Sequence, residues 1–272
     1  MKRLLLSYLM MLFAFNAMAN EDYSARFKKA LKDSIPLAKE ILADWEKQGP
    51  KDGDFYSSYS KYHLKKALKI AVTQTKYLSL YAADSHMVIK DSLGIADTYL
   101  YAGVTVADSA ALDSSFIYIR QGIEKFPRRL DLRFDLVNIY EMLDNCDKVF
   151  ETMEATANYA LANTGLIWSS NSDKVLFPDE GTLEDKIQEY VTNCFNTSTF
   201  KGMAEKFADL GLRLAPDNAL FMNDKAVIKA EAGDIKEAIR IMEEILKKNP
   251  DNTAISANIE KLKELMNSGM AK

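Results

Sequence analysis

The stretches 204–218 (AEKFADLGLRLAPDN) and 238–252 (AIRIMEEILKKNPDN) share one pattern and lie 34 residues apart. Each stretch begins with Ala, continues as an amphipathic run and ends in Pro-Asp-Asn, so Pro216 corresponds to Pro250. A period of this length is typical of paired helices that cannot bury their own apolar faces and must stack on the next pair. The sequence therefore predicts a row of stacked helical pairs.

The last repeat unit, residues 219–252, is the most regular part of the chain. Helices are predicted over 219–232 and 235–248, separated by Gly233-Asp234, where glycine suits a positive φ and aspartate an N-cap. The preceding unit, residues 183–218, follows the same plan less strictly. These two units are the clearest repeats.

A further helix is predicted over residues 253–268. One side of it is apolar and the other carries Lys, Glu and Asn. The apolar positions are Ile255, Ile259, Leu262, Leu265 and Met266. A one-sided terminal helix is what a helical array needs at its open end, so we interpret this segment as a cap.

The front half of the chain also has a helical period in most places. Helices are predicted at residues 23–48, 54–68 and 108–126, and as a pair within 130–163. Gly49-Pro50 ends the first of these, Pro127 ends the third, and Asp144-Asn145 forms the turn within the pair.

The helical period fades between residues 70 and 101. Alternating stretches at 77–81 and 87–90, with turn-forming residues at 91–94, predict a small β-hairpin inserted into the helical array. The expected fold is thus mainly α, with about four helical pairs, this insert and the C-terminal cap in a single domain over 20–272.

The 34-residue period resembles that of tetratricopeptide repeat (TPR) proteins. The stretch Gly122–Phe134 (GIEKFPRRLDLRF) is similar to a G-I-E-x-[FY]-P-D-R-L-D-M-R-F-G motif of uncharacterised exported TPR proteins of Bacteroidetes. Arg128, Leu132 and Asp135 stand where that motif has Asp, Met and Gly.

Three other segments resemble the same proteins. They are a G-P-x-D-x-D-x-Y segment at Gly49–Tyr56, a D-S-x-G turn at Asp91–Gly94 and an Asn-rich loop around Trp168. The resemblance implies a TPR-like α-solenoid, export from the cytoplasm and the β-hairpin insert. It implies no particular activity or ligand.

The first 19 residues have the layout of a signal peptide. Lys2 and Arg3 precede an apolar run at 4–15, and Ala17-Met18-Ala19 offers a cleavage site. A membrane anchor is the alternative, but such a run spans only about 18 Å as a helix, too short for a bilayer core. We expect cleavage after Ala19 and a mature protein in the periplasm or outside the cell.

Composition argues against some partners. The net charge is −4, and it becomes more negative when the leader is removed, which does not suit nucleic acid. No later segment is apolar enough to insert into a membrane. Cys146 and Cys194 would meet an oxidising compartment, either as a disulfide between consecutive helical units or as two separate buried thiols.

Catalytic motifs are not recognisable in the sequence. His63 and His86 do not have metal-ligand spacing, and there is no phosphate-binding loop, G-x-S-x-G or C-x-x-C. We therefore expect no enzymatic activity, no metal and no cofactor, with a hydrolase of unrecognised site as a weaker alternative.

A basic cluster is the strongest charged feature, formed by Lys125, Arg128, Arg129 and Arg133. It would either grip an acidic peptide or pair with acids such as Asp131 to fix the junction between two helices. The second interpretation is favoured because the cluster spans that junction.

The loop at 163–181 is long and contains Trp168 and Phe177. Trp168 would either fold back onto the helices or stand out as an anchor that stacks on a sugar. The second case gives an alternative function, a glycan-binding or small-molecule-binding accessory protein.

The first helix of each pair lines the concave face of a TPR stack, and aromatic and Asn side chains there suit binding. We predict a non-catalytic scaffold that binds a peptide or protein partner on this face. The predicted contact residues are Phe134, Asp135, Asn138, Tyr190, Asn193, Asn223 and Asp224, with Trp168 from the loop.

Overall fold

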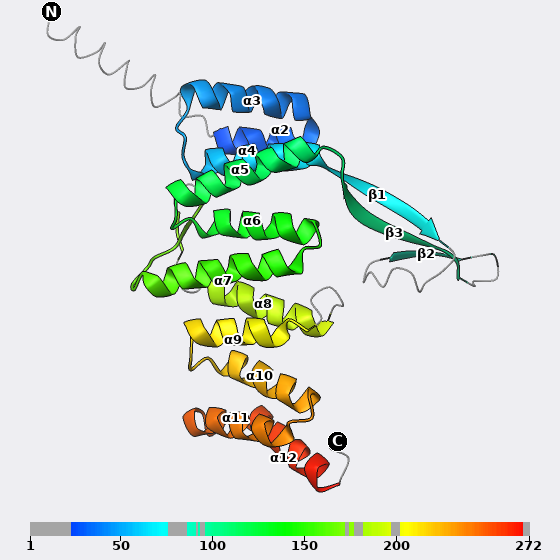
Figure 1. The fold of residues 1–272 in the computed structure, drawn as a ribbon, viewed down its shortest axis with the longest axis vertical. Coiled ribbons are helices and arrows are strands. Elements are labelled where there is room, and N and C mark those ends of the chain that lie inside the picture. Colours follow the sequence, from blue (N-terminus) through cyan, green and yellow to red (C-terminus); the bar gives the residue numbers. More distant parts are fainter. Residues whose placement is uncertain are drawn as a thin grey trace, which may run out of the picture. The chain divides into compact units, whose positions relative to one another are not determined.

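The protein is mainly helical in the part that the structure describes (Figure 1). The computed structural model describes residues 23–75, 86–90, 92, 96–171, 174–176, 182–196 and 202–268. The predicted leader with its site at Ala19, the predicted strand at 77–81, the turn at 91–94 apart from Ser92, and Phe177 lie outside these residues. None of the described helices has the length and apolar composition needed to cross a bilayer.

The helices are α2 (Tyr23–Asp33), α3 (Ile35–Gln48), α4 (Gly53–Ala67), α5 (Ser109–Lys125), α6 (Leu130–Met142), α7 (Cys146–Ala162), α8 (Leu183–Asn196), α9 (Ala204–Leu214), α10 (Ala219–Glu231), α11 (Ile235–Lys248) and α12 (Thr253–Asn267). The longer strands are β1 (Leu68–Thr75), β2 (His86–Lys90) and β3 (Ala96–Val106). Two short strands, β4 (Ser169–Ser170) and β5 (Lys174–Val175), pair with each other in the loop after α7.

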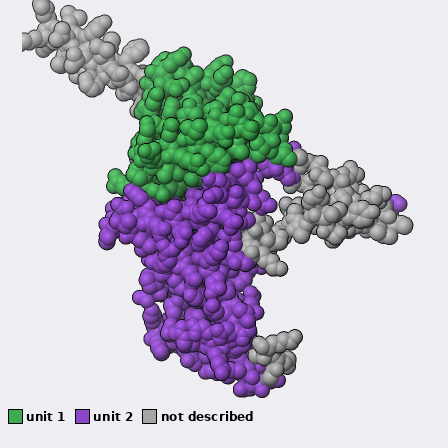
Figure 2. Space-filling view, in the orientation of Figure 1, with its two compact units in different colours: residues 1–69, 105–136, 169–174 green, residues 70–104, 137–168, 175–272 purple. Residues whose placement is uncertain are grey.

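The chain divides into two compact units (Figure 2). The first contains residues 1–69, 105–136 and 169–174, and the second contains residues 70–104, 137–168 and 175–272. Each unit is described separately below.

The first unit has an aromatic core. Trp45 of α3 stacks on Tyr23 of α2 with ring centroids 5.5 Å apart and meets the ring of Phe55 edge-on at 5.8 Å. Tyr59 of α4 stacks on Tyr118 of α5 at 4.5 Å. Helix α4 is buried along most of its length because α2, α3 and α5 all contact it.

The single helix expected over residues 23–48 is wrong. The structure has two helices, α2 and α3, which are separated at Ser34. Ser34 accepts a hydrogen bond from the Leu37 amide as the N-cap of α3, and Pro36 lies in the first turn. Proline has no N–H and its ring crowds the preceding turn, so the helix must restart there.

The β-insert is confirmed and is larger than expected. Strands β2 and β3 form the antiparallel hairpin, with Met87 opposite Leu100 and Val88 opposite Tyr99. Strand β1, which the sequence analysis did not predict, lies on the other side of β3, giving the order β1-β3-β2.

The second unit contains the two repeats, and its helices follow one another in contact. Helix α8 packs on α9, α9 on α10, α10 on α11 and α11 on the terminal helix α12. Asn218 and Asn252 occupy the same place in successive links, and each accepts a backbone N–H at the start of the next helix. Gly233 has φ 86° in the α10–α11 turn, which glycine adopts without strain. The predicted helix boundaries of this region are therefore confirmed.

The two repeats use different residues at one equivalent contact. Gly211 of α9 lies against the ring of Phe221, so closely that an added Cβ would be 2.5 Å from it. The positions 34 residues later are Ile245 and Ile255, both buried in one apolar cluster of α10, α11 and α12. The space between two helices can be filled by a small residue against a large one, as with Gly211 and Phe221. It can equally be filled by two residues of similar size, such as two isoleucines.

Substituting Gly211 with Ala should destabilise the second unit. The buried Phe221 ring leaves no room for the methyl group, and such overpacking costs about 1–3 kcal/mol. Urea denaturation measures the loss, and the double variant Gly211→Ala/Phe221→Leu should recover part of it. Gly103→Ala is the control, because an added Cβ there meets nothing within 4 Å. Equal losses for both single variants would contradict the proposed contact.

His63 of α4 lies in the aromatic core of the first unit. Its ring stacks on Tyr118 at 5.5 Å, and its Nδ1 is buried without a hydrogen-bond partner. Burial, followed by the charge of Lys66, lowers the pKa of His63 below 6.5, while Asp108 acts in the opposite direction. The folded state therefore favours the neutral ring.

The stability of the protein should fall as the pH drops below 6.5, because the unfolded chain then binds a proton that folded His63 resists. The free energy of unfolding should decrease less between about pH 7.5 and about pH 5.5 in a His63→Phe variant than in the wild type. The variant retains His86, so any contribution of that residue cancels. Parallel pH profiles would show that His63 does not cause the dependence.

Candidate binding surface

Helices α8 and α10 carry the polar surface on which binding is predicted. Each helix has a defined start: Thr182 and Asp185 cap α8 reciprocally through their side chains, and Asn218 caps α10. One side of each helix is buried and apolar, with Ile187 and Phe221 among its residues. The remaining side of each helix holds the polar residues.

A side-chain hydrogen bond joins the two helices. Gln188 Nε2 of α8 donates to Asp224 Oδ2 of α10 at 2.5 Å. The other amide atom, Gln188 Oε1, is buried without a partner, and the same holds for Oδ1 of Asn223, the neighbour of Asp224. Buried acceptors without donors are uncommon and costly, so one on each helix marks this pair of helices as incompletely satisfied.

Asp224 has no cation beside it. It takes part in no ion pair among the described residues, and burial raises its pKa above the usual value although the hydrogen bond from Gln188 acts the other way. The lysines of α8 and α10 have other partners, which are Glu189 for Lys186, Asp209 for Lys225 and Glu205 for Lys229. The surface therefore holds an unneutralised, half-buried carboxylate.

Tyr190 does not contribute to this surface, which corrects its predicted role as a contact residue. Its side chain is 0% exposed. The ring stacks on Phe207 of α9 at 5.0 Å, and its hydroxyl donates to Glu141 Oε1 at 2.6 Å. The ring is buried because Tyr190 lies on the same side of α8 as Ile187, which is also buried. Asn193, one turn later, is half-buried.

The three predicted contact residues of α6 differ in unit and in exposure. Phe134 and Asp135 belong to the first unit, and Asn138 is an exposed residue of the second. Asp135 accepts hydrogen bonds from Ser57 at 2.6 Å and from Lys61 at 2.8 Å. Burial raises the pKa of Asp135, while Lys61 and Ser57 oppose that shift. This carboxylate is therefore already paired with a cation inside the first unit.

Two members of the basic cluster, Arg129 and Arg133, are structural, as the favoured interpretation holds, whereas Lys125 and Arg128 are exposed. Arg129 is 2% exposed. Its guanidinium forms ion pairs with Asp54 of α4 and with Asp131, and the distance from Arg129 Nε to Asp131 Oδ1 is 2.8 Å. Arg133 donates to the Pro127 carbonyl. Burial tends to lower the pKa of Arg129, but the hydrogen bonds and charges of the two aspartates outweigh it and raise that pKa.

Gly53 lets the guanidinium of Arg129 come close to the start of α4. A Cβ at that position would lie 2.5 Å from Arg129 Nη1, so the guanidinium would have to shift. Two motifs that the sequence analysis singled out, at 49–56 and 122–134, therefore meet at Arg129. Another motif contains Trp168. The residue after it, Ser169, donates its amide N–H to the Arg128 carbonyl at 2.9 Å.

Trp168 packs on α7. Its ring lies 5.9 Å from that of Tyr159 in a tilted arrangement, and the side chain is half-buried. The Leu176 amide donates to the Trp168 carbonyl at 2.9 Å and holds the loop at this point. This placement agrees with a ring that folds back onto the helices.

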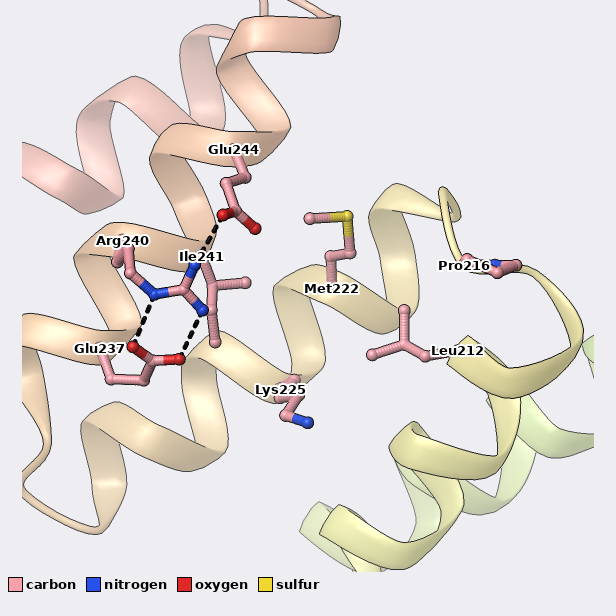
Figure 3. A pocket seen from close by; sticks show the side chains of 8 residues that line it. All are labelled: Leu212, Pro216, Met222, Lys225, Glu237, Arg240, Ile241 and Glu244. Carbon is pink, nitrogen blue, oxygen red and sulfur yellow. Dashed lines mark hydrogen bonds and ion pairs between the residues drawn. The ribbon is translucent and has the colours of Figure 1, made fainter.

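A hollow of about 270 Å³ lies between α9, α10 and α11 (Figure 3). Leu212, Met222 and Ile241 supply its apolar lining. Arg240 forms one side, held between Glu237 at 2.7 Å and Glu244 at 2.6 Å. The sequence analysis missed this hollow, because its residues belong to an ordinary apolar stripe and an ordinary charged face of adjacent helices.

Cys146 and Cys194 are not joined in a disulfide in this structure, and both are half-buried. Burial, with a smaller contribution from Cys146, raises the pKa of Cys194 to about 11, so this thiol is a weak nucleophile at neutral pH. Within the described ranges, no group of three or more His, Cys, Asp or Glu side chains could hold a metal ion.

Replacing Asp54 with Asn should destabilise the first unit. The substitution leaves the buried charge of Arg129 paired with Asp131 alone, and losing a charged hydrogen-bond partner there costs about 1–3 kcal/mol. The free energy of unfolding from urea denaturation measures this cost. Glu151→Gln is the matched control, because it breaks the exposed pair with Lys148 and should cost below about 1 kcal/mol. A comparable loss in both variants would contradict a stabilising role of the Arg129 cluster.

The sequence has no match among models of protein families, and no curated protein matches it either.

Proposed function

We propose that this chain is an exported, non-catalytic TPR-like scaffold that binds a peptide or protein partner on the polar surface of α8 and α10. The observation that carries the proposal is the pair of buried, unpartnered amide oxygens beside the unneutralised Asp224. A partner that supplies hydrogen-bond donors would complete these groups.

The repeated corners of the second unit support the TPR-like part of the proposal. Pro216 and Pro250 lie in equivalent links, and the Asn caps that follow them start equivalent helices. If α8 and α10 are regularly spaced, the polar groups of the two helices would contact successive parts of an extended ligand. A polypeptide in an extended conformation has donors at such regular intervals, which a compact small molecule lacks.

The alternative, a glycan-binding protein, depends on Trp168. A ring that stacks on a sugar needs one open face, and Trp168 already packs on Tyr159. The peptide-binding proposal is therefore preferred, and binding through Trp168 becomes one outcome of the test below.

Site-specific photocrosslinking in the cells that make this protein tests the proposal. A photoreactive residue at Asn223 should give a discrete crosslinked product that a protease, but not a glycosidase, removes. The same residue at exposed Lys247 of α11 should give no such product, because Lys247 is not part of the α8 and α10 surface.

Adding Asp224→Asn should reduce the crosslink from the 223 position, whereas Trp168→Ala should not change it. Loss with Trp168→Ala, or a carbohydrate product, would favour the glycan-binding alternative. Equal crosslinking from the 223 and 247 positions would remove the basis for a specific surface on α8 and α10.

A further inference from the structure

Two acceptor atoms on the α8 and α10 surface have no donor within the described residues. Gln188 uses its NH₂ group on Asp224, and its own oxygen has no donor. Asn223 Oδ1 has no donor either. Asp224 keeps further acceptor capacity, since a carboxylate has about four lone-pair sites and the Gln188 bond uses one. What this surface lacks is a group rich in N–H donors.

The missing group should also be positively charged. Asp224 is half-buried and pairs with no cation among the described residues, whereas each lysine of the same two helices is paired with another carboxylate at 2.6–2.8 Å. A neutral donor would satisfy hydrogen bonds but leave the charge of Asp224 uncompensated in a partly desolvated place, which is costly. An ammonium or guanidinium group supplies both the donors and the charge.

A metal ion fits this surface less well than an organic cation. Calcium and magnesium need several oxygen ligands with adequate negative charge, and this surface has one carboxylate. No candidate metal cluster occurs in the part of the chain that the structure describes. The two amide oxygens are buried, so a ligand that pairs with the Asp224 carboxylate contacts them only if the amide side chains rotate.

We propose that Asp224, with Gln188 and Asn223, forms a site for the side chain of a Lys or Arg residue in the partner peptide. This inference rests on the proposed peptide-binding function and adds the residue class that the surface selects. The Gln188 hydrogen bond holds the carboxylate in place between the two helices, and the amide oxygens add acceptors for the remaining N–H groups. Such a charge-assisted contact in a partly desolvated place contributes to specificity as well as affinity.

The test uses the full mature chain and random heptapeptide libraries that differ only at a fixed central residue. The central residue is Lys, Arg, acetyl-lysine, norleucine or Glu, and binding is measured by fluorescence anisotropy at low salt. The Lys and Arg libraries should bind about tenfold more tightly than the norleucine and acetyl-lysine libraries, the difference expected of one well-placed charged contact.

Asp224→Asn should abolish this preference while keeping the Gln188 hydrogen bond, since the Asn carbonyl still accepts. Asp251→Asn is the matched control, because it removes the same charge from the exposed α11–α12 link and should leave the preference unchanged. Thermal denaturation shows that both variants are folded. Binding without a cationic preference, or a preference that survives Asp224→Asn, would overturn this inference alone. Failure of every library to bind would overturn it together with the peptide-binding function.

Discussion

The helices of this protein are stable only because each one covers the apolar side of another. Helix α11 illustrates the constraint: one side buries Ile239, Ile241, Met242 and Ile245, and the opposite side carries charged residues. Burying apolar surface contributes roughly 25 cal/mol per Å², and an isolated helix of this length gains almost nothing without it. Packing of α11 against α10 and α12 therefore maintains the structure of the second unit.

The end of the array shows where this coverage stops. Helix α12 buries Ile255 and Ile259 against α11, but Leu265 and Met266 remain 44% and 39% exposed. The first unit satisfies the same requirement in another way, with stacked aromatic rings around α4 instead of an aliphatic stripe. Large rings bury much area per residue and tolerate the tilted and edge-on geometries seen among Trp45, Phe55 and Tyr59.

Polar residues fall into two groups according to whether the structure supplies them with a partner. Arg129, Asp54 and Asp135 form ion pairs within the first unit and stabilise it. Gln188, Asn223 and Asp224 are only partly engaged, and so retain the capacity to interact with a ligand. The proposed recognition of a cationic peptide side chain follows from this difference, since residues of the same chemical types occur in both groups.

The sequence by itself determined the helices of the repeats, their turns and their caps, because amphipathic period, Pro, Gly and Asn act over a few neighbouring residues. It also pointed to the β-insert, although it did not predict β1, whose position depends on pairing with β3. The tertiary structure alone decided that Tyr190 is buried, that Arg129 finds Asp54, and that Gln188 bonds to Asp224, 36 residues away. Hydrogen bonds and ion pairs require the two atoms to lie within about 3 Å of each other. Residues far apart in the sequence reach that distance only when the chain folds.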